Sequence, residues 1–348
     1  MQWNDRRKKI LAIIVEAYIA TGEPVGSKFL AEKLGNAVSS ATIRNEMAEL
    51  AAAGYLEQPH TSAGRIPTAP AFRFYLDNLM QHDTLSEEDM ERIDTSLRVL
   101  SDSPEKLMEE ASKILATSTG YAAVTTTPDQ KGSAIRRLEL MPLSPRKAAM
   151  LLVTDSGVLR NRTCRFEQEI RLEELDKVAE LLRMRFLNVP LAQICLADIQ
   201  EVLAAMGIAA ERYSPVLVAF YGLVQESADS EVLLTGQLNL LQHPDYAPDR
   251  AKSLLTFLAQ REQVADMLQS AGDAEGLRIL LGSESTHGEL NESSIITTGY
   301  SAGGKKRGTI GLIGPMRMDY ASAVPKVEYF AKAVGRILSD MLDDEGDD

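Results

Sequence analysis

The sequence contains few residues of the kinds that build disulfide frameworks, metal centres or membrane spans. Its 348 residues include two cysteines and four histidines, and the histidines show no metal-ligand spacing. No apolar run approaches the roughly 18 residues that a membrane helix needs. The N-terminal segment lacks the small-residue cleavage site of a signal peptide. We therefore expect a cytoplasmic protein that has no metal or other cofactor and no membrane partner.

Basic residues are also in deficit, since 37 Lys and Arg stand against 50 Asp and Glu and the formal net charge is −13. This balance by itself argues against a nucleic-acid partner, because phosphates attract positive charge. Residues 1–76, however, carry nine basic and seven acidic side chains, which leaves the remainder of the chain at −15. A slightly basic head on an acidic body is typical of a small nucleic-acid module joined to another domain.

The pattern of this head predicts three helices followed by a hairpin. The helices cover residues 5–20, with Asp5 as the N-cap, then 29–34, with Ser27 as the cap, and then 41–53, which ends at Gly54. Extended segments at 55–59 and 65–68 flank a turn and predict a β-hairpin. This order is that of a winged helix-turn-helix, in which the third helix reads DNA.

The third helix has the two faces that a reading helix needs. Ile43, Met47 and Leu50 share one face and are expected to pack inward, which leaves Ala41, Asn45 and Ala48 on the other. Asn can pair with adenine and Arg with guanine, while hydroxyls at a helix start bind phosphate. An exposed polar face with a serine cap is the alternative. The candidate DNA-binding residues on this helix are Ser39, Ser40, Thr42, Arg44 and Asn45.

Further candidates lie on the hairpin and on the first helix. Arg65 can enter the minor groove, and His60 and Thr61 flank the turn before it. A surface arginine on a tight turn and a histidine that caps the hairpin are the alternatives. Arg6 and Lys8 are candidate phosphate contacts, although a basic first turn can also be merely solvated.

The rest of the chain predicts a mixed α/β domain with a helical interruption. An acidic helical connector covers 86–116, and the helices of the interruption fall between residues 172 and 225. Strands are expected before and after this stretch, and a helix follows them. The expected strands are 122–127, 136–141, 148–154, 158–166, 232–235, 277–281, 294–300 and 309–313, and the remaining helices are 250–269 and 322–342.

No segment predicts catalysis. The stretch from Gly299 to Lys306 nearly matches a phosphate-binding loop, but Lys306 replaces the hydroxyl that would hold Mg²⁺ and a strand follows instead of a helix. We interpret it as a β-hairpin. Cys164 and Cys195 are expected to be buried, inert thiols. We therefore expect a protein that is not an enzyme.

Two segments of the head resemble a known family. SSATIRNEMAEL (residues 39–50) and GYLEQPHTSAGRIPT (residues 54–68) are similar to the N-terminal domain of HrcA, the heat-inducible transcription repressor of bacteria. IGLIGPMRMDY (residues 310–320) resembles the C-terminal signature of that family, and segments 151–157, 282–284 and 294–300 match more weakly. The chain departs from the pattern at residues 69–72, where members commonly have a glycine before the aromatic residue.

The resemblance implies an α+β multidomain fold. It consists of an N-terminal winged helix-turn-helix, a GAF-like α/β domain, and a mainly helical dimerisation domain inserted into the latter. The expected boundaries are 1–82 for the DNA-binding domain, 83–107 for a helical linker, 108–166 and 231–342 for the GAF-like domain, 167–230 for the insertion and 343–348 for an acidic tail.

The resemblance also implies a function. The partners would be the double-stranded CIRCE operator, an inverted repeat before heat-shock chaperone genes, a second copy in a homodimer, and the GroEL chaperonin, which promotes the active fold. Dimerisation also has a physical reason, because a two-fold dimer on a palindrome doubles the contacts of one small module. A metabolite-sensing regulator that uses the GAF-like domain is the alternative. Candidate dimer contacts are Leu175, Leu182, Phe186, Val216 and Phe220, most of which would otherwise form the core of the insertion.

Overall fold

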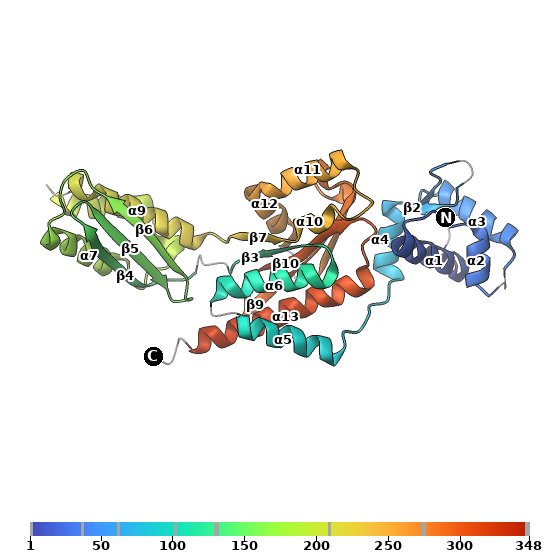
Figure 1. Ribbon diagram of the computed structural model, residues 1–348, viewed down its shortest axis with the longest axis horizontal. Coiled ribbons are helices and arrows are strands. Elements are labelled where there is room, and N and C mark those ends of the chain that lie inside the picture. Colours follow the sequence, from blue (N-terminus) through green and yellow to red (C-terminus); the bar gives the residue numbers. More distant parts are fainter. Residues whose placement is uncertain are drawn as a thin grey trace.

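The computed structural model describes residues 3–35, 38–60, 63–100, 103–128, 132–207, 210–272 and 276–344. Three units follow one another along its longest axis, and we call them the head, the body and the insert (Figure 1). The head comprises the described residues of 3–78, the insert those of 132–230, and the body those of 87–127 and 231–344. Helices and strands occur throughout, which confirms the expected mixed α and β class.

The head contains the three helices and the hairpin that its sequence predicts. They are α1 (Asp5–Thr21), α2 (Ser27–Lys33), α3 (Ser40–Ala52), β1 (Leu56–Glu57) and β2 (Ile66–Pro67), followed by α4 (Ala69–Asn78). β1 and β2 pair antiparallel, with Leu56 opposite Pro67. The expectation of Asp5 as the first N-cap is wrong, because the side chain of Asn4 accepts the hydrogen bond from the Arg7 amide at 2.8 Å. Asp5 instead lies in the first helical turn, where its negative charge interacts favourably with the helix dipole and stabilises the helix.

The core of the head is formed by one apolar face of each helix. Ile43, Met47 and Leu50 of α3 are buried as predicted. A separate aromatic cluster joins the N-terminus to the hairpin and to α4. Trp3 stacks on Phe74 with ring centroids 3.7 Å apart and meets Tyr55 edge-on at 5.0 Å. These contacts fix the chain on both sides of the hairpin.

The body is a five-stranded antiparallel sheet between two layers of helices. Its strand order is β7-β3-β10-β9-β8. Helices α6 and α13 share a core with one face, and α11 and α12 share a core with the other. Residues alternate between the two cores along β3, where Ala123 belongs to the first and Val124 to the second. The bounds are α6 (Pro104–Thr119), β3 (Ala122–Thr126), β7 (Val232–Thr235), α10 (Gln237–Leu240), α11 (Pro248–Ala259), α12 (Arg261–Gly272), β8 (Arg278–Leu281), β9 (Ser293–Ala302), β10 (Lys305–Pro315) and α13 (Tyr320–Asp344).

The predicted linker at 83–107 is largely a packed part of the body. Helix α5 (Glu87–Leu100) contacts α6 and α13. Asp94 of α5 accepts a hydrogen bond from the hydroxyl of Tyr329 at 2.9 Å and one from Arg336 at 2.7 Å. The acidic pattern predicted a connector, whereas Ile93 and Leu97 of α5 are buried and Asp94 is held by its two partners on α13.

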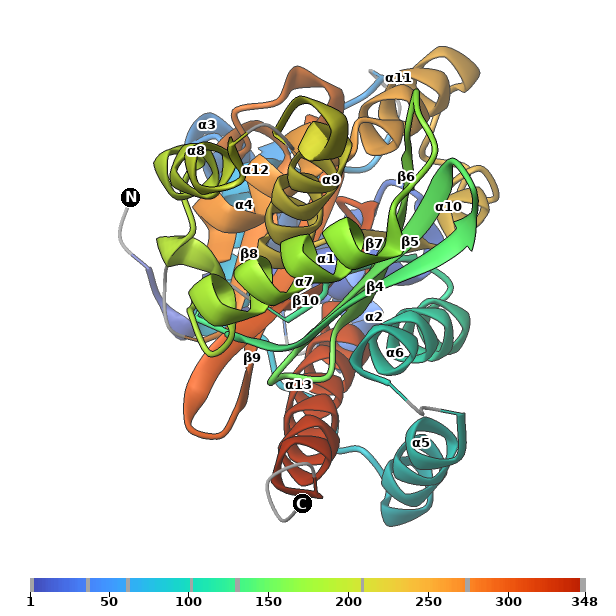
Figure 2. The ribbon, with the colours of Figure 1, turned by 90° about the vertical axis from the view of Figure 1, so that its left-hand side faces the viewer.

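The insert begins earlier than the expected residue 167. It contains a three-stranded antiparallel sheet in the order β4-β5-β6, together with α7, α8 and α9 (Figure 2). Apolar side chains of these strands and helices form a core of their own. Sequence periodicity identified these strands correctly but could not show which sheet they join. The bounds are β4 (Ile135–Ser144), β5 (Lys147–Thr154), β6 (Leu159–Arg165), α7 (Leu172–Phe186), η1 (Leu191–Gln193), α8 (Leu196–Ala205) and α9 (Ala210–Ala228).

The insert leaves and re-enters the body at neighbouring points. Thr126 at the end of β3 lies opposite Val232 at the start of β7. The Thr127 amide donates to the carbonyl of Glu231 at 2.8 Å, and the Glu231 amide donates to the hydroxyl of Thr127 at 2.7 Å. The sheet of the body therefore closes across the base of the insert.

Three smaller expectations have mixed outcomes. Residues 299–306 form part of the β9–β10 hairpin, whose turn has positive φ at Gly303 and Gly304, as interpreted from the sequence. Cys164 is buried, and burial raises the pKa of its thiol to about 11. The expectation that Cys195 is buried is wrong, because this residue is exposed at the start of α8 and its thiol contacts Asp198 at 3.1 Å.

Candidate nucleic-acid interface

Helix α3 presents a polar face to solvent at its N-terminal half. Ser39 caps the helix, and its hydroxyl accepts from the Thr42 amide at 3.1 Å and contacts the Thr42 hydroxyl at 2.9 Å. The Ser39 side chain is thus the helix cap, and Ser40 lies half-buried behind it. Free amides of the first turn and these hydroxyls form a suitable surface for a phosphate group.

Arg44 and Asn45 are the exposed polar side chains in the middle of this face. Both are exposed, as are Ala41 and Ala48 on either side of them. The Nε of Arg44 donates a long 3.4 Å hydrogen bond to the carbonyl of Ser40, which leaves the rest of the guanidinium available. Small alanines allow a helix to approach the floor of the major groove closely, where Arg and Asn recognise guanine and adenine.

The acidic side of α3 is neutralised by the first helix. The Nε of Arg7 donates to Glu46 at 2.7 Å, and Arg7 also pairs with Glu49. The hydrogen bond that Arg7 donates to Glu46 is the main reason why the pKa of Arg7 is raised. This arrangement holds α1 against α3 and offsets two carboxylates that would repel DNA. The sequence alone did not single out Arg7 from its basic cluster, because its partners lie about 40 residues further along the chain.

The same pairing limits one predicted phosphate contact. Arg6 lies 3.7 Å from Glu46, with half of its side chain exposed, so its charge is shared with an acidic neighbour. Lys8 is half-buried on the next part of the helix. Both remain predicted phosphate contacts, and the structure places them on α1 rather than on the face that carries Arg44.

The hairpin is tied to the loop before α2. Val25 and Arg65 exchange two backbone hydrogen bonds of 2.9 Å, and the Arg65 guanidinium donates to Gln58 at 2.6 Å. Gly64 lies so near this loop that a Cβ there would be 2.4 Å from the carbonyl oxygen of Val25. The hairpin and the helices therefore form one rigid head. His60 is exposed before the turn, and Thr61 lies outside the described residues.

Other kinds of site find little support in the described part of the chain. No group of three His, Cys, Asp or Glu side chains there could hold a metal ion. None of the helices in those same ranges combines the length and apolarity that crossing a membrane requires. A cavity of about 390 Å³ lies between α5 and α6 beside Lys326.

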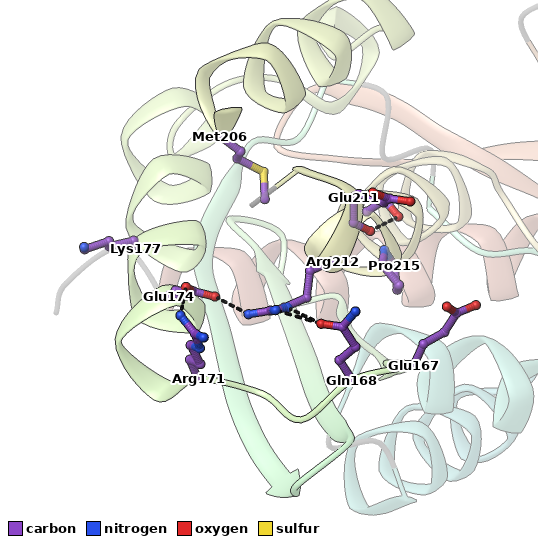
Figure 3. A pocket seen from close by; sticks show the side chains of 10 residues that line it. Glu167, Gln168, Arg171, Glu174, Lys177, Met206, Glu211, Arg212 and Pro215 are labelled. Carbon is purple, nitrogen blue, oxygen red and sulfur yellow. Dashed lines mark hydrogen bonds and ion pairs between the residues drawn. The ribbon is translucent and has the colours of Figure 1, made fainter. Parts of the chain in front are cut away.

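A cavity of about 950 Å³ lies in the insert between the first turns of α7 and α9 (Figure 3). Most of its lining residues are polar or charged, and Glu174 pairs there with both Arg171 and Arg212. Arg212 donates to Gln168 at 2.7 Å and to Glu174 at 3.2 Å. The cavity belongs to the insert and not to the sheet of the body, so it does not support metabolite sensing by a GAF-like domain.

Comparison with known proteins assigns the chain to a family. A family model described as the HrcA protein C terminal domain matches residues 105–324. A protein named heat-inducible transcription repressor HrcA from Pelotomaculum thermopropionicum is 33% identical over 343 residues, which cover 97% of each chain. One of the same name from Syntrophobacter fumaroxidans is 35% identical and covers 99% of each chain. The chain belongs to the HrcA family.

This HrcA family is a family of transcription repressors, not of enzymes. The fold is also found in a crystal structure described as a hypothetical protein at 2.2 Å resolution. That structure matches with a TM-score of 0.66 and 24% identity, and the alignment covers 98% of this chain and all of the other. The matched length shows that the arrangement of head, body and insert also occurs in that structure.

The first prediction concerns the rigidity of the head. We expect Gly64→Ala to lower the free energy of unfolding by about 1–3 kcal/mol, because the new methyl group overlaps the Val25 carbonyl and forces the hairpin away from its loop. Chemical unfolding measures this loss. Gly288→Ala is the control, since nothing lies within 4 Å of a Cβ at that position. Equal stability of the two variants would contradict the close approach.

Proposed function

We propose that this HrcA-family protein represses transcription as a homodimer, whose two heads bind the half-sites of a CIRCE-type inverted repeat before heat-shock chaperone genes. The exposed face of α3 carries this proposal, because Arg44 and Asn45 lie there between small alanines. Backbone hydrogen bonds between the hairpin and the loop before α2 hold the head in one conformation. The head then acts as a winged helix-turn-helix, with α3 in the major groove and Arg65 near the minor groove. The family name of its relatives supports the same activity.

The second prediction separates base reading from phosphate contact. We expect Arg44→Ala or Asn45→Ala to weaken binding to the operator by about 1–3 kcal/mol and to leave binding to random DNA nearly unchanged. Fluorescence anisotropy with both duplexes measures the two affinities. Lys8→Ala is the matched variant, which we expect to weaken both and to reduce the salt dependence. Equal losses on both duplexes for Arg44→Ala would make Arg44 a phosphate contact.

The homodimer requires a surface other than the residues first expected. Leu175, Leu182, Phe186, Val216 and Phe220 are all at most 2% exposed in one chain, so they form the core of the insert. The pattern of apolar residues could not distinguish an internal core from a dimer contact. A second chain must therefore meet side chains that remain exposed.

The free face of the insert sheet has the required composition. On β5, alternate residues are buried against the helices, which leaves Leu151 and Val153 half-buried on the other face. On the same face, Leu159 of β6 lies opposite Val153 and Met141 of β4 lies opposite Ala149, and these two side chains are 52% and 47% exposed. The cross-strand neighbours of Leu151 and Val153 on this face include Arg137, Glu139 and Asn161, so the face combines apolar and polar side chains. An antiparallel sheet whose outer face carries exposed apolar side chains can pack against a second sheet. We propose that two copies of this face form the two-fold contact.

The third prediction tests this face. We expect Leu159→Glu or Met141→Glu to convert the dimer into monomers, because each variant places two carboxylates in one apolar contact. Sedimentation at several concentrations measures the change. Val218→Glu is the control, since Val218 is 70% exposed and lies on α9, on the covered side of the sheet. A dimer that tolerates Leu159→Glu and Met141→Glu but not Val218→Glu would place the contact on the helices.

We further propose that the GroEL chaperonin promotes the active fold, as the family resemblance implies. The chain topology supports this dependence. Ala122 of β3 pairs with Ile313 of β10, and the whole insert separates β3 from β7. Pairing such distant strands closes large loops, and the chain loses this conformational entropy before stabilising contacts form. Folding is therefore slow, and the edges of the unfinished sheet stay exposed during it.

The fourth prediction follows from this topology. After complete denaturation, we expect chaperonin with ATP to raise the yield of operator-binding protein several-fold over spontaneous refolding, because it isolates chains whose body sheet is still open. Operator binding at a fixed protein concentration measures the yield. Chaperonin without ATP and native protein with chaperonin are the controls. Equal yields with and without chaperonin would contradict the dependence.

A further inference from the structure

Two arginines connect the head to the body, Arg73 through several hydrogen bonds and Arg317 through one hydrogen bond together with packing. Arg73 on α4 donates from Nε to Glu284 at 2.9 Å, pairs with the other carboxylate oxygen of Glu284, and donates from Nη2 to the carbonyl of Ile279 at 2.7 Å. Ile279 is on β8, and Glu284 ends the short helix η3 (Gly282–Glu284) that follows it. We call these contacts the Arg73 clamp. They join a helix of the head to an edge strand of the body.

Partial burial raises the pKa of Glu284, but the hydrogen bond from Arg73, that from the Leu281 amide and the charge of Arg73 together lower it by more. The carboxylate thus stays ionised in its contact with Arg73. The pKa of Arg73 is raised in turn, mainly by its hydrogen bond to Glu284. A planar guanidinium that meets one carboxylate with two nitrogens fixes direction as well as distance.

Arg317 forms the second connection, and this arginine belongs to the body, whereas Arg73 belongs to the head. It lies between β10 and α13 of the body, where it pairs with Asp245 through Nε. Its Nη1 donates to the carbonyl of Ile19, in the last turn of α1, at 3.1 Å. The guanidinium packs against Gly22, whose Cβ would lie 3.0 Å from its central carbon. A cation at the C-terminal end of α1 also complements the helix dipole. We call these contacts the Arg317 clamp.

An apolar seam lies between head and body as well. The rings of Phe72 in the head and Tyr320 in the body are 6.4 Å apart, and buried residues of both units belong to one continuous core. Beyond α4, the amide of Asp83 donates to the carbonyl of Ala321 at 3.0 Å. Apolar contacts favour burial without specifying an angle, whereas the two clamps are directional.

We propose that Arg73 and Arg317 are positioning residues, which hold the head at a fixed angle on the body and thereby set the half-site spacing that the dimer accepts. This inference rests on the proposed function, because only a dimer on an inverted repeat has a spacing to select. Head and insert lie at opposite ends of the molecule (Figure 1). A small rotation at the junction therefore displaces both reading helices of a dimer that is joined through its inserts.

The geometry of DNA makes this angle consequential. In B-DNA one turn takes about 10–10.5 base pairs, so one added base pair turns a half-site by roughly 35° about the helix axis. A rigid dimer cannot follow this rotation without losing contacts on one half-site. A dimer with mobile heads can follow it, and it then loses its preference among spacings.

The test compares the parent with the double variant Arg73→Gln, Arg317→Gln. The control is Arg98→Gln, which removes an arginine–carboxylate ion pair, between Arg98 and Asp340, that lies inside the body and is more exposed than the two clamps. Binding is measured on a single half-site and on inverted repeats at the preferred spacing and at one and two base pairs from it. We expect the parent and the control to lose about tenfold in affinity at one base pair from the preferred spacing, and the double variant to vary less than about threefold.

Single half-site affinity should be the same in all three proteins. A double variant that retains the parental spacing profile, or that loses affinity for the single half-site, overturns the inference. Hydrogen exchange gives a readout without DNA, since the segment 79–86 at the junction should exchange faster in the double variant alone. Unchanged exchange there also overturns it. A parent that binds no inverted repeat better than random DNA would instead contradict the proposed function, and faster exchange in the double variant would still show that the clamps hold the junction.

Discussion

The pairing of β3 with both β7 and β10 is the contact on which the rest of the molecule depends. β3 lies inside the sheet of the body, where its alternate residues contribute to the cores on both faces. Its last residues close the sheet across the base of the insert, and its partner β10 leads directly to Arg317 and α13. The position of the insert and that of the head therefore both derive from one strand of five residues. Both strands that pair with it come from distant parts of the chain, so this part of the sheet forms only when those segments have come together.

Electrostatics confine DNA binding to a small part of the surface. The chain carries a net charge of −13, and the body and insert contribute most of the acidic excess. Proximity of DNA to that surface is unfavourable, and the repulsion is screened within about 10 Å at ordinary ionic strength. Placing the head at one end of a long molecule keeps the duplex away from the acidic body. Within the head, Arg7 pairs with Glu46 and Glu49 and offsets part of the negative charge of α3.

Sequence reasoning predicted local structure well and long-range association poorly. The buried face of α3 and the strand 232–235 were predicted to the residue, because each depends on neighbours within a few positions. The membership of β4, β5 and β6 in the insert was not, since a strand pattern does not name its partner. Arg317 lies within a family signature that the sequence showed, but its contact with Ile19 joins positions almost 300 residues apart. The reading residues remain predictions, because exposure on α3 is necessary for base contact and does not demonstrate it.

The shared core of head and body links folding to DNA binding. Leu11 and Ile14 of α1 belong to the same continuous core as Val327 and Phe330 of α13. Helices that share a core gain their stability from tertiary packing, and short isolated helices are marginal in water. The head therefore relies on the body for part of its stability, and a chain whose sheet has not closed offers the head no surface to pack on. In a repressor of the proposed kind, any process that delays closure of the body sheet lowers the number of competent heads. Chaperonin would then change the amount of DNA-binding protein through the apolar packing between head and body, without a separate signalling site.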